Sequence, residues 1–347
     1  MKVLAVDDDP ICLELLRETL ESEGHDVTTV ADGEEARSLL RSGDTRGLST
    51  DWEMPGLNGP ALCQAIREVD FGRYIFIIML TSHSSHEDLI EGLRSGADDF
   101  LSKPFDPIEL SVRLSVANRV SALETRDLMI FTLAKLAESR DPETGQHLER
   151  VRLYCRMLAD ELIQRNYNDG ALTPEFSKLI FMTSPLHDIG KVGIPDAVLL
   201  KPGKLTDEEF NIMRQHSRIG AETLDAALRR APGAQFLLMA RDIAATHHER
   251  FDGTGYPNGI SGTDIPLSGR IMAIADVYDA LRSKRVYKAA MPHEKAASII
   301  REGRGTHFDP DLVDAFNALE AQFADVSECL SNEGDDLPVL ELETAAY

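Results

Sequence analysis

Histidines and carboxylates in the second half of the chain lie at spacings that suit metal binding. Glu143 and His147 are four residues apart, so a helix would place them on one face. The other candidate ligands are His187, Asp188, His216, His247, His248 and Asp276. Imidazole and carboxylate together bind borderline transition metals such as Mn, Fe, Co, Ni or Zn. Because the set exceeds the needs of one ion, it predicts two or three transition-metal ions, with Asp188 bridging two of them.

These histidines also have a structural interpretation. A lone buried histidine is usually a hydrogen-bonded core residue rather than a ligand. Burying this many ionisable groups without a metal would, however, be costly in free energy. The complete set therefore favours a metal centre.

A second set of polar residues lies in the first part of the chain. Its members each fall at the end of a predicted strand: Asp7, Asp8, Asp51, Thr81 and Lys103. Because the carboxyl ends of parallel strands meet at one edge of a sheet, these residues should converge on one pocket. Three carboxylates there can hold Mg²⁺. A lysine and a hydroxyl can orient a phosphoryl group on the central carboxylate.

The elements that must position these residues differ between the two halves. Apolar runs predict strands at Val3–Val6, Val27–Val30 and Tyr74–Leu80. Amphipathic stretches predict helices at Pro10–Glu23, Glu34–Leu40, Gly59–Val69 and Ser85–Ser95. This alternation indicates an α/β doubly wound domain with a parallel sheet. From about Pro107 onward helix follows helix, which predicts an all-α second domain.

The first half resembles the CheY-like receiver domain of two-component response regulators. The segments VDDD, DWEMPGLNG, TS and KPF stand in the order and at the spacing of that family. The resemblance implies that Asp51 accepts a phosphoryl group and that Asp7 and Asp8 bind Mg²⁺ with it. It implies a switch made of Thr81, Phe100 and Lys103. One departure is the stretch before Asp51, Thr45-Arg-Gly-Leu-Ser-Thr50, which is polar where a buried central strand should be apolar.

The second half resembles the HD-GYP phosphodiesterases, from about Asp141 to Phe316. The motifs are HDIGK, IPD, LLKPGKLT, HHERFDGTGYPNG, IPLSGRIMAIADVYDAL and GTHFDP. The resemblance implies an HD-superfamily fold, Fe or Mn in the metal site, and hydrolysis of cyclic di-GMP to linear pGpG or on to GMP. His147, His187, Asp188 and Asp276 match the minimal HD set, and His216, His247 and His248 match the HD-GYP additions. Glu143 matches a glutamate that supports a third metal in some members.

The same resemblance assigns residues around the metals. Lys191, Arg285 and Lys288 should contact substrate phosphates, with Asp188 and Lys191 as the catalytic residues. Adjacent metals would lower the pKa of a shared water, and the hydroxide would attack phosphorus in line. The signature Gly255, Tyr256 and Pro257 should form a lip over the site or a docking surface for GGDEF-domain proteins.

The chain divides into a series of predicted parts. They are a receiver domain at 1–120, a helical linker at 107–140 overlapping both domains, an HD-GYP domain at 127–325 and an acidic, disordered tail at 326–347. The linker could be one helix or two. Its heptad-like seam is Val116, Val120, Leu123, Ile130, Ala134 and Ala137, interrupted by Asp127. That seam could pack inside the domains or form a homodimer.

Charge and hydropathy narrow the class of protein. The net charge of −23 lies mostly in residues 1–105 and in the tail, so no basic face is predicted for a nucleic-acid polymer. No apolar run is long enough to cross a membrane, and the first residues do not resemble a signal peptide. We therefore expect a cytoplasmic protein, and the receiver resemblance implies that a sensor histidine kinase is its partner.

Three functions remain open at this point. The first is a cyclic di-GMP hydrolase controlled by phosphorylation of Asp51. The second is a non-catalytic module that binds a cyclic dinucleotide or a GGDEF-domain protein. The third is an HD phosphohydrolase for another cyclic dinucleotide, such as cyclic GMP-AMP. No expected metal ligand is missing, which favours catalysis over binding alone.

Overall fold

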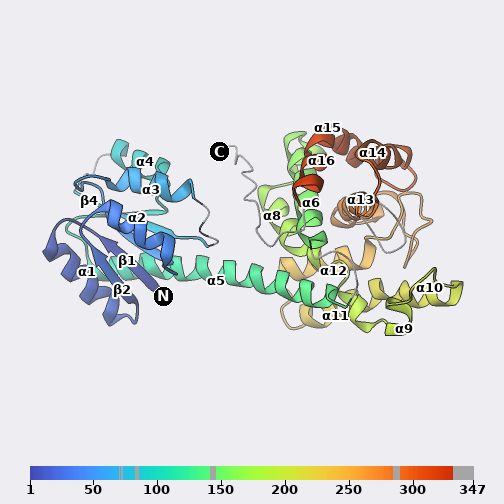
Figure 1. The fold of residues 1–347 in the computed structure, drawn as a ribbon, viewed down its shortest axis with the longest axis horizontal. Helices are drawn as coiled ribbons and strands as arrows, with labels where there is room; N and C mark the ends of the chain where they lie inside the picture. The colour runs from blue at the N-terminus through green and yellow to red at the C-terminus, as the bar shows by residue number, and fades with distance from the viewer. Residues whose placement is uncertain (70, 72, 83–85, 141–145, 284–289, 331–347) are drawn as a thin grey trace. The chain divides into compact units, whose positions relative to one another are not determined.

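The protein is described by a computed structural model that covers the chain except residues 70, 72, 83–85, 141–145, 284–289 and 331–347 (Figure 1). It divides into two compact units, Met1–Asp127 and Leu128–Tyr347. None of the described helices is both long and apolar enough to span a membrane.

The first unit contains a parallel sheet in the strand order β2-β1-β3-β4-β5. Its strands are β1 (Lys2–Val6), β2 (Asp26–Val30), β3 (Gly47–Asp51), β4 (Phe76–Thr81) and β5 (Asp99–Ser102). The helices between them are α1 (Pro10–Ser22), α2 (Gly33–Ser42), α3 (Gly59–Arg67) and α4 (His86–Arg94). The predicted α/β doubly wound receiver fold is confirmed.

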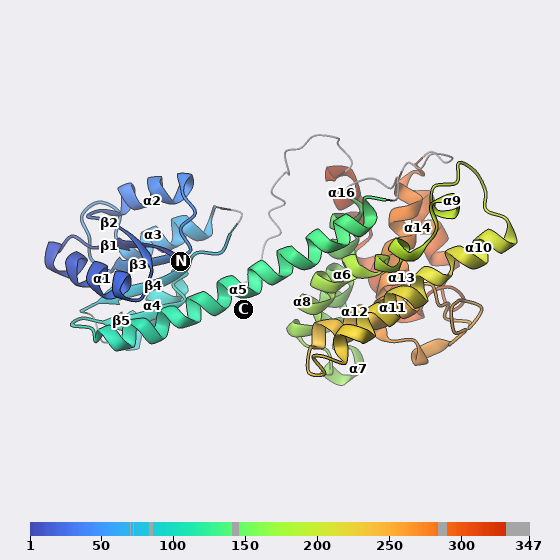
Figure 2. The ribbon, with the colours of Figure 1, turned by 90° about the horizontal axis from the view of Figure 1, so that it is seen from below.

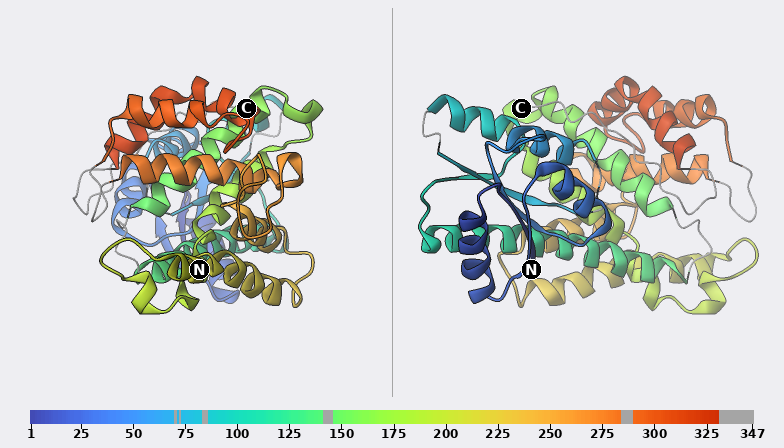
Figure 3. Two further views of the ribbon diagram at one scale, coloured as in Figure 1. Left: turned by 90° about the vertical axis from the view of Figure 1, so that its right-hand side faces the viewer. Right: turned by 60° about the vertical axis from the view of Figure 1, so that its left-hand side comes forward.

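Helices cover both faces of this sheet. On one face, Leu16 of α1 and Leu110 of α5 (Pro107–Glu138) pack against Ile78. On the other, α2 and α3 contribute Leu40 and Leu62. Figure 2 shows α1 and α5 opposite α2 and α3, and the right-hand view in Figure 3 shows the strands lying between them. Both faces of the central strands are therefore buried, as a parallel sheet requires.

The polar strand β3 is fully buried. It pairs with β1 on one side and β4 on the other, so its backbone hydrogen bonds are satisfied in the ladder. The Thr50 hydroxyl donates to the Asp51 carbonyl oxygen at 3.2 Å, whereas Ser49 Oγ has no hydrogen-bond partner among the described residues. Backbone hydrogen bonding to β1 and β4 thus keeps β3 in the centre of the sheet despite its polar side chains.

Two Asp side chains and one Asn cap the N-termini of α1, α2 and α3. Asp9 accepts a hydrogen bond from the backbone N–H of Ile11 at the start of α1, and Asp32 accepts one from Glu35 at the start of α2. Asn58 does the same at the start of α3. These caps satisfy N–H groups that have no partner inside the helix. They fix where each loop at the carboxyl edge of the sheet ends.

The helix α5 is continuous, so the linker is one helix rather than two. Val116 and Val120 of the predicted seam pack against the first unit, and Ile130 and Ala134 are buried in the second. The side chain of Leu123 lies outside the described residues. The packed interpretation of the seam therefore holds for these residues. The exposed apolar residues of α5 include Leu128, Met129, Leu133 and Leu136.

The described secondary structure of the second unit is helical, apart from one isolated β-bridge between Arg304 and Phe308. Its first helices are α6 (His147–Gln164), α7 (Tyr167–Gly170), α8 (Pro174–Thr183), α9 (Asp196–Leu199), α10 (Asp207–Met213), α11 (Gln215–Leu228) and α12 (Gln235–Thr246). They are followed by α13 (Leu267–Arg282), α14 (His293–Glu302), α15 (Pro310–Ala318) and α16 (Glu320–Cys329). Short 3₁₀ turns lie at Ser184–Leu186, Ile189–Gly193 and Gly262–Asp264.

The core of this unit centres on α6 and α13. Tyr154 of α6 stacks on Phe323 with ring centroids 4.4 Å apart, and it meets Tyr278 of α13 edge-on at 5.3 Å. In the left-hand view of Figure 3, α13 (orange) crosses the middle of the unit beneath the red C-terminal helices. This packing fixes the positions of α6 and α13, which carry the candidate metal ligands His147 and Asp276.

The prediction of a disordered tail from residue 326 is wrong at its start. The helix α16 continues to Cys329, with Val326 and Ser327 buried. Val326 packs in the core that contains Phe323, so the start of the predicted tail belongs to the helical unit. The rest of the predicted tail, 331–347, lies outside the described residues.

Candidate metal centre and phosphorylation site

Candidate metal ligands of the helical unit gather in two adjacent groups. The first group is Asp188, His216, His247 and His248. The second is His147, His187 and Asp276. Within each group one ligand atom from every residue lies within 4.8 Å of the others. The structure thus brings together all the predicted ligands that it describes, while Glu143 lies outside the described residues.

Asp188, a member of the first group, also reaches the second group. Its Oδ1 is 3.2 Å from His216 Nε2 and 3.7 Å from His247 Nε2, both in the first group. Its Oδ2 is 3.2 Å from His187 Nε2 in the second group. Each carboxylate oxygen therefore faces a different group, which is the arrangement needed to bridge two ions.

Backbone carbonyls orient three of the imidazoles. The Nδ1 atoms of His187, His216 and His247 lie 2.9, 2.7 and 3.0 Å from the carbonyl oxygens of Ser184, Met213 and Ile243, respectively. A carbonyl oxygen can only accept a hydrogen bond, so each Nδ1 must carry the proton. Each Nε2 then keeps its lone pair and faces the centre, as in metal-bound histidines.

A glycine allows the ligand-bearing segments to meet. A Cβ at Gly190 would lie 1.9 Å from the carbonyl oxygen of His216 and 2.5 Å from the amide nitrogen of Gly220. Both atoms belong to the backbone of α11 and cannot move aside easily. Gly190 of the HDIGK motif therefore lets the turn that follows Asp188 lie directly on α11.

Two of the donors, His216 and Asp188, are in the protonation state that metal binding requires. Burial lowers the pKa of His216 to about 4, so its imidazole is neutral at physiological pH. Burial opposes ionisation of Asp188, but the nearby Lys191 ammonium, with His187 and His247 close by, holds the pKa of this carboxyl well below its usual range. His187 Nε2 and Asp188 Oδ1 are buried and make no hydrogen bond with any described residue. These nitrogen and oxygen donors fit divalent transition-metal ions.

Sequence reasoning missed a buried ion pair behind His147. Asp279 Oδ2 lies 2.8 Å from His147 Nδ1, and Arg150 donates to Asp279 through Nε at 2.6 Å and Nη2 at 2.9 Å. Burial opposes ionisation of Asp279, but the hydrogen bonds from Arg150 and His147 lower its pKa below the ordinary value. The pair therefore fixes the orientation of a ligand imidazole. Helical spacing could have revealed it, because Arg150 follows His147, and Asp279 follows Asp276, by three residues.

A pocket of about 430 Å³ opens over the metal ligands. Its lining includes His247, His248, Asp276, Tyr256, Arg250 and His307. The ring of Tyr256 lies 4.7 Å from that of His248, so the predicted Gly255–Pro257 loop borders the centre. Lys191 Nζ lies 2.8 Å from Asp188 Oδ2. Arg285 and Lys288 lie outside the described residues.

Glu249, which the sequence analysis also did not single out, anchors the loop that contains Gly255–Pro257. Glu249, 2% exposed, accepts hydrogen bonds from the backbone N–H groups of Asn258 at 2.7 Å and Gly259 at 3.1 Å. Its carboxylate therefore ties the end of the loop to the segment carrying His247 and His248. Its place directly after two ligand histidines is the only sequence signal for this role.

The predicted phosphorylation pocket of the first unit is also assembled. Asp7, Asp8 and Asp51 form a third group of candidate ligands. Lys103 Nζ lies 2.6 Å from Asp7 Oδ2 and 2.9 Å from Asp51 Oδ1. Burial raises the pKa of Asp51 above its usual value, although Lys103 opposes this.

The predicted switch residues lie around this pocket. Thr81 is buried at the end of β4, and the ring of Phe100 on β5 meets the indole of Trp52 edge-on at 6.2 Å. The backbone N–H of Trp52 donates to Asp51 Oδ1 at 2.9 Å. One residue thus touches both the candidate phosphoacceptor and the aromatic switch.

Two family descriptions match the two units. Residues 3–115 match the response regulator receiver domain, and residues 132–312 match the HD domain. A Vibrio cholerae protein named "Probable cyclic di-GMP phosphodiesterase" is 38% identical over 98% of this chain and 82% of its own length. The chain belongs to the response regulators with an HD phosphodiesterase domain. Another member of this family, "Cyclic di-GMP phosphodiesterase response regulator RpfG" of Xanthomonas campestris pv. campestris, is 36% identical over 94% of this chain and 89% of its own length.

A partial likeness links the chain to a protein named for another cyclic dinucleotide. The Vibrio cholerae "3'3'-cGAMP-specific phosphodiesterase 2" is 43% identical, but only over 59% of this chain and 38% of its own length. The two relatives described above, both named for cyclic di-GMP, match 98% and 94% of this chain.

Proposed function

We propose that this response regulator hydrolyses cyclic di-GMP at the centre around Asp188, under the control of phosphorylation at Asp51. The observation that carries the proposal is the position of Asp188, whose two carboxylate oxygens face separate ligand groups. A two-metal site can supply an activated water and stabilise both the attacking and the leaving oxygen of a phosphodiester. Relatives of similar architecture are named for this activity.

The chain's own residues supply the rest of the site. Lys191 places a positive charge beside Asp188, where it can stabilise a non-bridging phosphoryl oxygen. Arg250 and His307 line the same pocket and offer further donors. Arg285 and Lys288 are assigned to the substrate phosphates on the motif resemblance alone. We assign Fe or Mn to the centre, with Glu143 supporting a third ion, and pGpG or GMP as the product.

The receiver site should work with Mg²⁺ and a sensor histidine kinase in the cytoplasm. Asp7, Asp8 and Asp51 supply three carboxylates for the ion, and Lys103 pairs with the acceptor carboxylate. These features support phosphotransfer to Asp51. The exposed apolar residues of α5, Leu128 and Leu133 among them, support a homodimer, and the Gly255–Pro257 loop could bind GGDEF-domain proteins.

The test combines metal analysis with turnover on the same sample. Full-length protein should contain two or three Fe or Mn ions per chain and convert cyclic di-GMP faster than cyclic GMP-AMP. Beryllofluoride with Mg²⁺ should change the rate in the wild type but not in Asp51→Asn. A protein that binds cyclic di-GMP without hydrolysing it when fully metallated would instead be a binding module. Faster turnover of cyclic GMP-AMP would favour the activity of the HD-domain relatives named for that substrate.

A further inference from the structure

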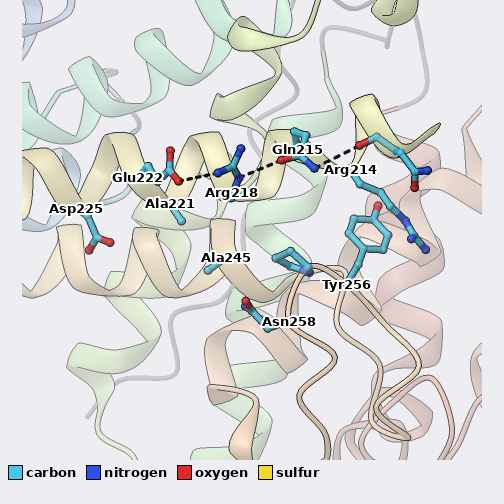
Figure 4. Close-up of a pocket in the computed structure, with 11 residues that line it drawn as sticks. Arg214, Gln215, Arg218, Ala221, Glu222, Asp225, Ala245, Tyr256 and Asn258 are labelled. Carbon is cyan, nitrogen blue, oxygen red and sulfur yellow. Dashed lines mark hydrogen bonds and ion pairs between the residues drawn. The ribbon is translucent and has the colours of Figure 1, made fainter. Parts of the chain in front are cut away.

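A second cavity adjoins the metal pocket. It has a volume of about 540 Å³ and lies between α11, the end of α12 and the loop after Tyr256. Arg214 and Tyr256 line both this cavity and the pocket over the metal ligands. Figure 4 shows polar side chains, Gln215 and Arg218 among them, following Arg214 along α11 toward Asp225. A molecule bound at the metals could therefore extend past Tyr256 into this groove.

Arg214 is held in an unusual way for a charged side chain. Its Cζ lies 4.6 Å from the ring centroid of Tyr256 and 4.8 Å from that of Phe210, within the range of cation–π attraction. The two rings are 6.2 Å apart and nearly perpendicular. Aromatic contacts therefore fix the guanidinium without using its hydrogen-bond donors.

At least one hydrogen-bond donor of Arg214 is unused by the described residues. Its Nε is buried and has no hydrogen-bond partner among the described residues. A buried donor without a partner loses free energy, so a ligand that accepts its hydrogen bond would gain correspondingly. The phosphate groups of a substrate can pair with a cation nearer the metal centre, because Lys191 lies beside Asp188. A planar, fixed guanidinium is instead suited to a planar acceptor pair.

Guanine presents such a pair. Its O6 and N7 both accept hydrogen bonds, and arginine binds them through two N–H groups, whereas adenine offers an acceptor at N7 but a donor at N6. A base lies one ribose away from its phosphate, so the base of a dinucleotide bound at the metals would fall beside the metal pocket. We propose that Arg214 recognises the O6/N7 edge of one guanine of the substrate, in the groove beside Tyr256. This assignment rests on the proposed hydrolysis of cyclic dinucleotides.

The test compares bases on the metal-loaded, full-length protein. The kcat/KM is measured for cyclic di-GMP, cyclic di-IMP and cyclic di-AMP in the wild type, Arg214→Gln and Arg214→Lys. Cyclic di-IMP keeps O6 and N7 but lacks the 2-amino group. The wild type should favour both cyclic di-GMP and cyclic di-IMP over cyclic di-AMP by about tenfold to a hundredfold. Both variants should lose most of this preference, because lysine restores the charge but not the two-pronged donor.

The matched control is Arg229→Gln. It removes the same charge from an exposed position at the far end of α11 and should keep the base preference. Equal losses on all three dinucleotides in Arg214→Gln would overturn the proposal and make Arg214 a phosphate-binding residue. Retention of the preference in Arg214→Lys would also overturn it. If cyclic di-IMP behaved like cyclic di-AMP in the wild type, recognition would lie on the other edge of guanine.

A base-free substrate separates this proposal from the proposed function. The chromogenic diester bis(p-nitrophenyl) phosphate reports the metal centre, and each dinucleotide can be measured as a competitive inhibitor of its hydrolysis. If no dinucleotide is hydrolysed, the proposed function fails, but inhibition constants still reveal any preference for guanine and its dependence on Arg214. If the wild type shows no preference in these constants, the assignment of Arg214 is wrong whatever the turnover.

Discussion

The buried pair of Arg150 and Asp279 should contribute strongly to stability, and Asp279→Asn tests this. The side chains are 6% and 1% exposed, so the substitution leaves a buried guanidinium without its countercharge. Breaking a buried pair in this way costs about 3–5 kcal/mol of unfolding free energy. For a unit of this size, that corresponds to a fall of roughly 6–20 °C in the melting temperature. Because Asp279 also orients His147, metal affinity should fall by about 10- to 100-fold.

An exposed pair in the same unit provides the control. Arg304 donates to Asp314 through Nε at 3.1 Å and Nη2 at 2.8 Å, nearly the same fork, but the side chains are 49% and 46% exposed. Water screens such a pair, so Asp314→Asn should leave the unfolding midpoint almost unchanged.

The assay uses chelator-treated protein and two optical signals. Far-UV circular dichroism follows the helices, while the emission of Trp52, the only tryptophan, follows the receiver. In Asp279→Asn the unfolding transition of the helical second unit should shift, because the substitution lies there. The unfolding transition of the receiver, followed by Trp52, should not shift. Equal stabilities of the two aspartate variants would refute the argument that burial makes the pair of Arg150 and Asp279 important.

Other substitutions probe the two sites. Asp188→Ala should abolish hydrolysis of cyclic di-GMP and leave the receiver's emission unchanged; undiminished turnover would show that the carboxylate does not bridge metals. Gly190→Ala should lower metal content and thermal stability, since its Cβ would lie 1.9 Å from a backbone oxygen; a wild-type metal content and melting curve would contradict this. Mg²⁺ followed by beryllofluoride should change the emission of Trp52 in saturating steps, and Asp51→Asn should remove most of the second step. No step in a demonstrably phosphorylated wild type would mean that the indole does not sense the pocket.

The sequence singles out the candidate ligand residues more readily than the residues that support them. His187, Asp188, His216, His247 and His248 stand in recognisable motifs, and their chemistry is the same wherever the chain folds. Asp279 and Arg150 depend on the crossing of α6 and α13, which no local pattern encodes. They could have been suggested only by helical spacing from known ligands.

Strand β3 illustrates a different limit. Its side chains give little apolar signal, so local propensity alone would not place a central strand at Gly47–Asp51. Pairing with β1 and β4 places it there, and this depends on residues far away in the sequence. The linker illustrates another limit, because its sequence allows one helix or two. The apolar seam is interrupted at Asp127, yet α5 continues through this residue, since the backbone hydrogen bonds of a helix do not need an apolar side chain at every seam position.

The carbonyl contacts of the three ligand imidazoles have a consequence for metal loading. His187, His216 and His247 each bond a carbonyl three or four residues earlier in the chain, so the orientation of each ring is set by its own turn of backbone. Little side-chain conformational entropy then remains to be lost when an ion arrives. We expect the centre to be preorganised, so that ions can exchange while the surrounding helices stay folded. The metal that occupies the site in the cell would then depend on which ions are available, and not on which ion was present when the chain folded.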